Sequence, residues 1–542
     1  MTTAEPMTGP QAPAHGQAAA ALLPTPPGPE APRARPLSQA TLHSHGARVA
    51  VPTYDRSRLT PSVVHLSVGG FSRAHQLIYF DDLAERRISA EWGVVGVGLR
   101  QRHLQEALAP QDHLYTVVER SPDGERARVV GVMVDYLYAP DDPTAVLDRL
   151  SDPRTRLVTL TITPGGYLLD PQTRAFRADD PDVLRDLAQP SAPATVFGYL
   201  VEALDRRRRA GLAPFTVVSC DNLHRNGEAA RASVVGLAQL RDEVLARWIT
   251  DRVAFPSSMV DRITPQTPPE ERAALAARYG VDDRWPVVTE PFSQWFIEDV
   301  FSHGRPPLDE VGVHFVPDVG DYELMKTRLL NAGHSALGHL GSLAGYARMD
   351  ELMSDPVFAA YVARLMDDEV TPLLPAPEGV DLGAYKRTLL KRFANPAIAD
   401  QLSRLCRRGS AKLPQHLLPS LRQSQVQGRP APLLTLAVAG WCRYLRGTDD
   451  AGRPLPLEDP RAAELQALAL EGGADPRPLL AVRAVFGDLG DDPVFVADLG
   501  GALERLDRLG ARCRWRTRAP PSCRPWLWKA ARTRGRCSPS AR

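Results

Sequence analysis

The chain has 542 residues, of which 43% are hydrophobic and 24% charged; these are globular values, and the length predicts two to four domains. A net charge of +1 gives no sign of a nucleic acid or an acidic surface as partner. The six cysteines form no disulfide framework and no apolar run reaches the ~18 residues of a membrane span, so we expect a cytoplasmic protein.

The two ends of the chain differ in composition from the rest. Residues 1–50 are rich in Pro, Ala and Gly without periodicity, so we expect a disordered leader that cannot bury enough apolar surface to fold. Residues 512–542 hold nine Arg, one Lys and no acid, and we expect an atypical basic tail without structure. The ordered part is predicted as two domains, 51–316 and 317–511.

A strand, a glycine pair and a helix open the first domain. The apolar run 62–68 is typical of a buried parallel strand, and a helical pattern follows it to Glu85. In this context the pyrophosphate of a dinucleotide binds at a helix N-terminus. The G-x-G-x-x-G motif is incomplete, because Ser67 stands at its first glycine and Arg73 or Ala74 at its third.

Further strand patterns alternate with helical ones. The expected strands are Trp92–Leu99, Leu114–Glu119, Arg128–Tyr136, Leu157–Thr163 and Phe215–Cys220, with helices at Pro181–Leu187 and Ala192–Gly211. An irregular segment at Ala254–Pro265 and a strand-like return at Val287–Phe296 follow. The alternation predicts an α/β domain with a doubly wound sheet.

Two asparagines follow the last of these strands. Ligands of doubly wound sheets bind beyond the strand C-termini, where Asn222 or Asn226 could donate to a carbonyl or alkoxide oxygen. The two residues equally suit a turn built with Asp221 and Gly227.

A helix at the start of the second domain carries the most unusual polar arc. We expect it to span Tyr322–Leu343 with Asp321 as N-cap. At ~100° per residue one arc of roughly 140° holds Glu323, Lys326, Asn331 and His334. A buried lysine beside an amide and an imidazole suits a general base, whereas the alternative is a partly exposed amphipathic helix.

Helical patterns dominate the rest of the second domain. They cover Asp355–Val370, Gly383–Phe393, Ala397–Arg407, Leu433–Leu445 and Pro460–Leu468. Arg404 and Lys412 flank a loop that could bring positive donors to a polar substrate, or could form an ordinary basic loop.

Five blocks along the chain carry a resemblance to a known family. They are VHLSVGGFSRAHQ, VVSCDNLHRNG, FPSSMVDRITP, KTRLLNAGHS and RFANPAIADQLSRLCRRGSAK. With them the chain resembles the polyol-specific long-chain dehydrogenases over about Val51–Leu509. The resemblance implies a Rossmann-type N-terminal domain, a mainly α-helical substrate domain, and NAD or NADP, with NAD favoured, as cofactor without a metal.

The resemblance also implies roles for single residues. Lys326 would be the general acid/base, Asn222 and Asn331 would stabilise the oxyanion, His334 would contact a substrate hydroxyl, and Glu323 would pass the proton to solvent. Asp261, Arg404 and Lys412 match positions near the substrate. The expected cofactor-binding residues are Val68, Gly69, Gly70, Phe71 and Arg73.

Two departures from the family pattern keep alternatives open. Ser67 replaces a turn glycine and Pro164 replaces a glutamate, and the basic stretch 100–102 offers no acid for a ribose hydroxyl. The expected function is interconversion of D-mannitol and D-fructose, or of a close polyol and ketose, by a monomer. The alternatives are a hexuronate (fructuronate) reductase of the same family and a nucleotide-binding paralogue impaired in turnover.

Overall fold

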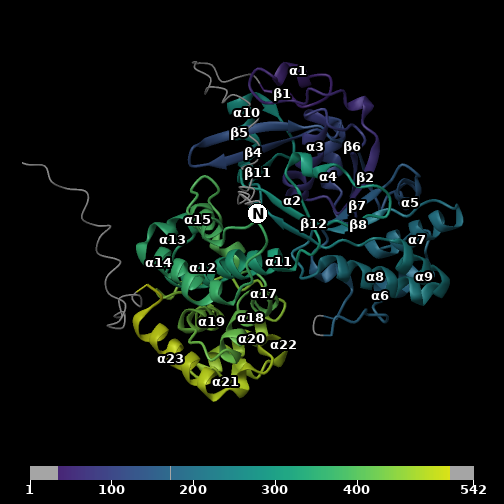
Figure 1. Cartoon of the computed structure of the whole chain (residues 1–542). Helices are drawn as coiled ribbons and strands as arrows, with labels where there is room; N and C mark the ends of the chain where they lie inside the picture. Colours follow the sequence, from purple (N-terminus) through teal and green to yellow (C-terminus); the bar gives the residue numbers. More distant parts are fainter. Residues whose placement is uncertain (1–33, 171–172, 513–542) are drawn as a thin grey trace, which may run out of the picture. The chain divides into compact units, whose positions relative to one another are not determined.

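The computed structural model describes residues 34–170 and 173–512, which form two compact units (Figure 1). The first unit contains the described residues up to Asn331 and the later segment Leu374–Asp400. The second contains Ala332–Leu373 and the described residues from Gln401 onwards. The chain therefore returns once to the first unit before it completes the second.

A parallel five-stranded sheet forms the centre of the first unit. Its strand order is β6-β3-β2-β7-β8, which is the arrangement of a Rossmann-type sheet, as predicted. The strands are β2 (Pro61–Leu66), β3 (Gly93–Gly98), β6 (Met133–Tyr138), β7 (Leu157–Leu160) and β8 (Thr216–Ser219). The order reverses beside β2, so β2 and β7 flank the point where such sheets bind their ligands.

Apolar clusters and helices cover both faces of this sheet, and consecutive residues of one strand point to opposite faces. In β2, Val63 joins one apolar cluster whereas Val64 joins the other, because side chains alternate along a strand. One cluster is closed by α3 (Gln76–Glu85) and α4 (His103–Leu108), and the other by α5 (Pro143–Ser151), α7 (Val196–Arg209), α8 (Asn226–Arg241) and α9 (Glu243–Arg252) (Figure 1).

Two smaller sheets correct the sequence analysis. The expected strand Arg128–Tyr136 is two strands: β5 (Gly124–Val130) and β6, which belong to different sheets. The chain passes from one sheet to the other at Gly131. A side chain is disfavoured there, because a Cβ would lie 2.8 Å from Pro52 Cγ. β5 pairs with β4 (Tyr115–Ser121), and β4 pairs with β11 (Val287–Thr289), so the expected strand Leu114–Glu119 lies outside the doubly wound sheet.

The third sheet positions part of the candidate site. It has the order β13-β12-β9, with β13 (His314–Val316), β12 (Gln294–Glu298) and β9 (Ser258–Asp261). The segment Ala254–Pro265 is thus not wholly irregular, and the return at Val287–Phe296 is divided between two sheets. Proline residues on either side of β9 concealed its short apolar core from pattern analysis.

Part of the expected leader is ordered. β1 (Arg35–Pro36) pairs with β10 (Val281–Asp282), and α1 (Leu42–His45) follows it. Leu37, Leu42 and Val49 are buried in one apolar cluster with residues from distant parts of the chain: Leu114, Val118, Val129, Leu275, Val281 and Val288. The prediction was wrong for residues 34–50, because a few well-placed side chains are enough to anchor a segment whose overall composition indicates disorder. Residues 1–33 and 513–542 lie outside the described residues.

The helix that carries Lys326 is interrupted. α11 (Gly320–Lys326) begins one residue before Asp321, and Val319 is its N-cap, so the expected N-cap was wrong. The π-helix Thr327–Asn331 follows, and then α12 (Ala332–Leu343). A period of 3.6 residues does not reveal such a widened turn, and π segments are frequent at functional sites.

Four further α-helices of the described residues belong to the first unit. They are α2 (Gly70–Ala74), α6 (Pro181–Ala188), α10 (Glu270–Tyr279) and α15 (Leu382–Phe393). α15 belongs to the segment that returns late in the chain.

The second unit is helical and is built around α12, in which every residue except His334 is buried. The other helices are α13 (Met349–Ser354), α14 (Pro356–Arg364), α16 (Leu402–Cys406), α17 (Gly409–His416), α18 (Leu418–Val426), α19 (Pro432–Tyr444), α20 (Ala462–Gly472), α21 (Arg477–Leu480), α22 (Arg483–Phe486) and α23 (Pro493–Leu509). α12 packs against α19 at Gly440, where a Cβ would lie 2.7 Å from Leu340 Cδ2.

Two observations on the helices complete the fold. The expected helix Ala397–Arg407 is reduced to α16, because Ala399 has a φ of +50° and ends any helical path before it. Among residues 34–170 and 173–512, no helix has both the length and the apolar character needed to cross a membrane.

Candidate active site

The turn after β2 leaves room on its open side. The backbone N–H of Ser67 donates to Val97 O at 2.8 Å, and that of Gly69 donates to Ser72 Oγ at 3.0 Å. A Cβ at Gly69 would have no atom within 4 Å, so the backbone is accessible there. Ser67 has a φ of +69°, a left-handed conformation that favours glycine and explains why the related motif has glycine at this place.

Arg73 supports this turn from inside the protein. Its side chain is buried, and its guanidinium donates to Gly69 O at 3.3 Å and to the carbonyl oxygen of Trp285. Val68, Gly70 and Phe71 lie on the same strand–turn–helix connection. The structure therefore brings the five predicted cofactor residues together, with Arg73 as the one whose side chain is already engaged.

The two asparagines after β8 have different positions. Asn226 is buried, and its amide donates to Asp221 O at 3.0 Å and Ser258 O at 2.7 Å. It also accepts from Ser258 N at 2.9 Å, so it builds the turn. Asn222 is exposed and is the asparagine available to a ligand. The turn role therefore holds for Asn226, whereas a ligand contact of Asn222 stays a prediction.

Lys326, the last residue of α11, is buried and donates from its amine to the side-chain carbonyl of Asn222. Burial lowers the pKa of this amine from its ordinary value, and the Arg392 guanidinium acts in the same direction. The carboxylates of Asp261 and Glu323 act in the opposite direction. The amine can therefore exist in its neutral form closer to physiological pH than an exposed lysine can.

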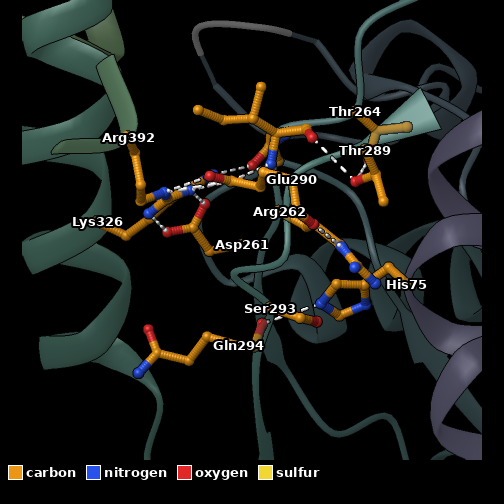
Figure 2. A network of polar contacts seen from close by, with 12 residues as sticks. His75, Asp261, Arg262, Thr264, Thr289, Glu290, Ser293, Gln294, Lys326 and Arg392 are labelled. Atoms are coloured by element: carbon orange, nitrogen blue, oxygen red, sulfur yellow. Dashed lines mark hydrogen bonds and ion pairs between the residues drawn. The ribbon is translucent and has the colours of Figure 1, made fainter. Parts of the chain in front are cut away.

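Three buried charged side chains lie beside Lys326 (Figure 2). Arg392 donates to both oxygens of Asp261, at 2.7 and 2.8 Å, and to Glu290 at 2.8, 3.0 and 3.1 Å. The side chains are 5% (Arg392), 3% (Asp261) and 2% (Glu290) exposed. Although burial opposes ionisation of Asp261, Arg392 holds the pKa of that carboxyl below its ordinary value.

Glu323 connects the interior to the surface. Its carboxylate is 7% exposed and accepts from the Nδ1 atom of His224 at 3.0 Å and from Arg225 N at 3.2 Å. The His224 side chain is 58% exposed. Glu323 precedes Lys326 by three residues on α11, so the two side chains are on neighbouring parts of one helix face.

Asn331 ends the π-helix five residues after Lys326 and is half-buried. In a regular α-helix, residues five apart point about 140° away from each other. The i→i+5 hydrogen bonding of a π-helix places more residues in each turn and brings positions five apart closer to one face. The interruption of the helix thus favours the joint action that the resemblance implies for the two residues.

The other predicted substrate residues belong to the second unit. His334 lies in the first turn of α12, Arg404 in α16 and Lys412 in α17, and all three side chains are half-buried. The Lys412 amine donates to Leu405 O at 2.9 Å. Burial, and next the neighbouring Arg404, lower the pKa of Lys412 to about 8.

Sequence reasoning missed Arg392, Glu290 and His224. A signal existed for two of them: Glu290 directly follows an apolar strand, and Arg392 opens the last of the five family blocks. Nothing in the sequence indicates that His224, in a polar turn, meets Glu323 from another part of the chain.

Across the described ranges 34–170 and 173–512, no group of three His, Cys, Asp or Glu side chains is arranged to hold a metal ion. Cys220, Cys406 and Cys442 are free and buried.

Comparison with known proteins gives a consistent result. The family model described as the mannitol dehydrogenase Rossmann domain matches residues 61–310, and the one for the mannitol dehydrogenase C-terminal domain matches residues 318–507. A mannitol 2-dehydrogenase of Phaeosphaeria nodorum is 47% identical over 86% of this chain and 82% of its own length. Mannitol dehydrogenase 2 of Saccharomyces cerevisiae is 44% identical over 87% of this chain and 95% of its own.

Solved structures agree with these relatives. The ternary complex of Pseudomonas fluorescens mannitol 2-dehydrogenase with NAD and D-mannitol has a TM-score of 0.83 at 42% identity, covering 88% of this chain and 98% of that one. A D-sorbitol dehydrogenase in substrate-free form has a TM-score of 0.80 at 38% identity, covering 88% of this chain and 99% of that one.

Proposed function

The chain belongs to the mannitol dehydrogenase family, and on this premise we propose that it is an NAD-dependent oxidoreductase that interconverts D-mannitol and D-fructose. The relatives that suggest this substrate pair are 42–47% identical, and one of them binds NAD and D-mannitol in its solved structure.

The observation that carries the proposal is the buried amine of Lys326 bonded to Asn222. A lysine whose pKa is lowered by burial is a suitable base for a hydroxyl proton. The open space at Gly69, where a Cβ would meet no atom within 4 Å, supports a dinucleotide at the turn after β2, because a phosphate can approach the backbone at a helix start there.

In the direction of polyol oxidation, neutral Lys326 accepts the proton of the C2 hydroxyl group. NAD, when bound, supplies the acceptor for the hydride that leaves C2. The Asn222 amide, and that of Asn331, donate N–H groups to the oxygen as negative charge develops on it. In the direction of ketose reduction, the ammonium form of Lys326 returns the proton to this oxygen.

The proton then has to leave a buried site. We propose that Glu323 passes it between Lys326 and solvent, since this carboxylate is buried and in contact with the exposed His224. The scheme uses only side chains and NAD, so the proposed reaction needs no metal ion.

We propose that the remaining hydroxyl groups of the substrate are contacted by His334, Arg404 and Lys412. Asp261 is paired with Arg392 on both of its oxygens, and we propose that its carboxylate lies near the substrate, beside Lys326. We also propose that the chain has a dinucleotide-binding domain at 51–316 and a substrate domain at 317–511.

The proposed cofactor is NAD for a reason in the structure. Of the basic stretch 100–102, Arg102 forms an ion pair with Asp141 and lies 5.0 Å from the ring centroid of Tyr138. Asp141 already balances the charge of Arg102, which argues against an interaction of Arg102 with the 2′-phosphate of NADP.

The test combines NADH or NADPH with D-fructose and with D-fructuronate, and follows the nicotinamide absorbance. We expect the highest kcat/KM with NADH and D-fructose. A preference for D-fructuronate would replace the polyol assignment by that of a hexuronate reductase. Binding of NADH without its oxidation by any ketose would identify a paralogue impaired in turnover. The left-handed backbone conformation of Ser67 would then be one feature to test as the cause.

We also propose that the protein acts as a cytoplasmic monomer. The free, buried cysteines of the described residues fit a reducing compartment. Light scattering coupled to gel filtration tests the monomer, which predicts a mass near 59.3 kDa.

A further inference from the structure

The cluster of Arg392, Asp261 and Glu290 has an unbalanced charge. One guanidinium faces two carboxylates, and each of the three side chains is at most 5% exposed. The guanidinium also lies 4.0 Å from the ring centroid of Phe292. With both carboxylates ionised, these three side chains have a net charge of −1; burial raises the pKa of Glu290, and Arg392 opposes that shift. The buried Arg262, which donates to Glu290 O at 2.9 Å, is itself paired with Glu119.

Isolated charge in a protein interior is costly, so a surplus of this kind needs compensation. Figure 2 shows Lys326 beside Arg392 and Asp261, from a different helix. When the Lys326 amine is protonated, the four side chains have a net charge of zero, and when it is neutral they have a net charge of −1. The cluster therefore supports the ammonium form, while burial of the lysine supports the neutral form.

We propose that Glu290 and Arg392 are positioning residues for the reaction: they hold the Asp261 carboxylate beside Lys326 and supply the single surplus negative charge that lets a buried lysine alternate between amine and ammonium. This inference rests on the role of Lys326 under the proposed function. It assigns Glu290, which contacts no predicted site residue except through Arg392, a share in setting the proton affinity of the reacting group.

The geometry is suited to hold Asp261 in one place. Both of its oxygens accept from Arg392, so the carboxylate cannot rotate without losing a hydrogen bond. Glu290 in turn fixes Arg392, and is itself fixed by Ile263 N at 2.6 Å. The chain of contacts runs from the residue after β11 through α15 to β9, and each link is a charge-assisted hydrogen bond or a backbone contact.

Other ionisable groups face the same region and act together with the cluster. Glu323 comes from α11 itself, His224 from the turn after β8, and Tyr385 from α15. His75, from the start of α3, acts on Asp261 in the same direction as Arg392. Asn222 is the neutral partner of the amine.

A purely structural role is the competing explanation. Arg392 also attaches α15, which comes late in the chain, to the first unit. If the cluster has only a structural role, removing its surplus charge affects stability and leaves the titration of Lys326 unchanged. If its charge acts on Lys326, the titration changes. The distinction requires a variant that alters charge and conserves shape.

The deciding variant is Glu290→Gln, which keeps the size of the side chain and removes the surplus charge. Acetic anhydride labels amines only in their neutral form, and peptide mass spectrometry reports the labelling of Lys326 as a function of pH. The exposed Lys391 serves as internal standard. We expect the titration of Lys326 to move to lower pH by roughly one unit. The acid limb of D-mannitol oxidation should move in the same direction.

Two further variants control for folding and for charge. Glu290→Asp keeps the charge and should leave the titration near that of the wild type even if it lowers stability. Asp186→Asn removes a buried carboxylate that contacts the turn before α7, and should not affect Lys326. If Glu290→Gln does not fold, Asp261→Asn should shift the titration in the same direction.

An unchanged titration in folded Glu290→Gln overturns the inference. An equal shift in Glu290→Asp also overturns it, because shape and not charge would then be responsible. The labelling needs neither substrate nor cofactor, so a shift in a protein that oxidises no polyol would leave this inference standing and reject the proposed function alone.

Discussion

Lys326 donates to the side chain of Asn222 across 104 residues of sequence. The carbonyl oxygen of the amide accepts from the amine, and so the NH₂ group of the same amide is the part that can donate to a substrate oxygen. One side chain thus orients the base and offers a donor to the developing charge.

Removal of Asn222 should therefore affect catalysis more than stability. For Asn222→Ala we expect kcat to fall ~10²- to 10³-fold in both directions, as for loss of an oxyanion donor. The side chain is exposed, so thermal unfolding should change little. Steady-state kinetics and circular dichroism measure the two effects.

Asn222→Asp tests the electrostatic part of this relationship. A carboxylate next to the amine favours the ammonium form and raises the pKa of Lys326. Polyol oxidation requires the neutral amine, so its acid limb should move to higher pH in this variant. A limb at unchanged pH would mean that another group controls the profile.

The conformation of Ser67 gives a prediction about stability. With a φ of +69° the residue is in a region where a Cβ costs energy, so Ser67→Gly should stabilise the protein by roughly 0.5–1 kcal/mol in urea unfolding. NADH should also bind more tightly, because the turn loses a side chain. The control is Arg87→Gly, at an exposed residue with a φ of +57°, which should gain stability without a change in NADH affinity. Equal effects of both variants on NADH binding would contradict the location of the cofactor at the turn.

For substitution of Arg392 we predict a loss of stability. Arg392→Met leaves two carboxylates buried without a cation, which should lower the free energy of unfolding by ~3–5 kcal/mol. The matched control is Arg364→Met, since Arg364 pairs with Asp368 at 3.1 Å with both side chains more than half exposed. That change should cost less than about 0.5 kcal/mol. Similar losses in the two variants would show that the cluster is not the buried unit described above.

His224 is the exposed end of the proposed proton path. His224→Gln retains a donor for Glu323 but cannot carry a proton, so kcat should fall severalfold at low buffer concentration and recover when imidazole is added. His303→Gln, at another exposed histidine, is the control and should show neither effect. Full activity of His224→Gln without imidazole would remove the residue from the path.

Local pattern was sufficient for much of the fold. The run 62–68, the glycine pair and the following helix are present, and the sheet around β2 has the doubly wound order. Alternation of apolar residues carries this information, because strand and helix periods are local properties. The division of the run around Gly131 between two sheets depends on distant packing, and no period reveals it.

The candidate site was predictable in a different way. Lys326, Asn222 and Glu323 were identified by resemblance, and geometry alone left each with an alternative. The partners of Arg392 lie 131 and 102 residues away, so the ion cluster is a property of the folded chain only. For the same reason the order of residues 34–50 was missed: their contacts are with residues at 112–129 and at 275–288.

The most direct test of the account is chemical rescue of Lys326→Ala. The variant should fold, bind NADH and lose D-mannitol oxidation by ~10²- to 10⁴-fold, the usual contribution of a general base. Added methylamine or ethylamine should restore part of the rate, in proportion to the concentration of the neutral amine at each pH. A variant that oxidises D-mannitol at a near-normal rate, or one that responds equally to neutral and protonated amine, would contradict the role of Lys326 as the base.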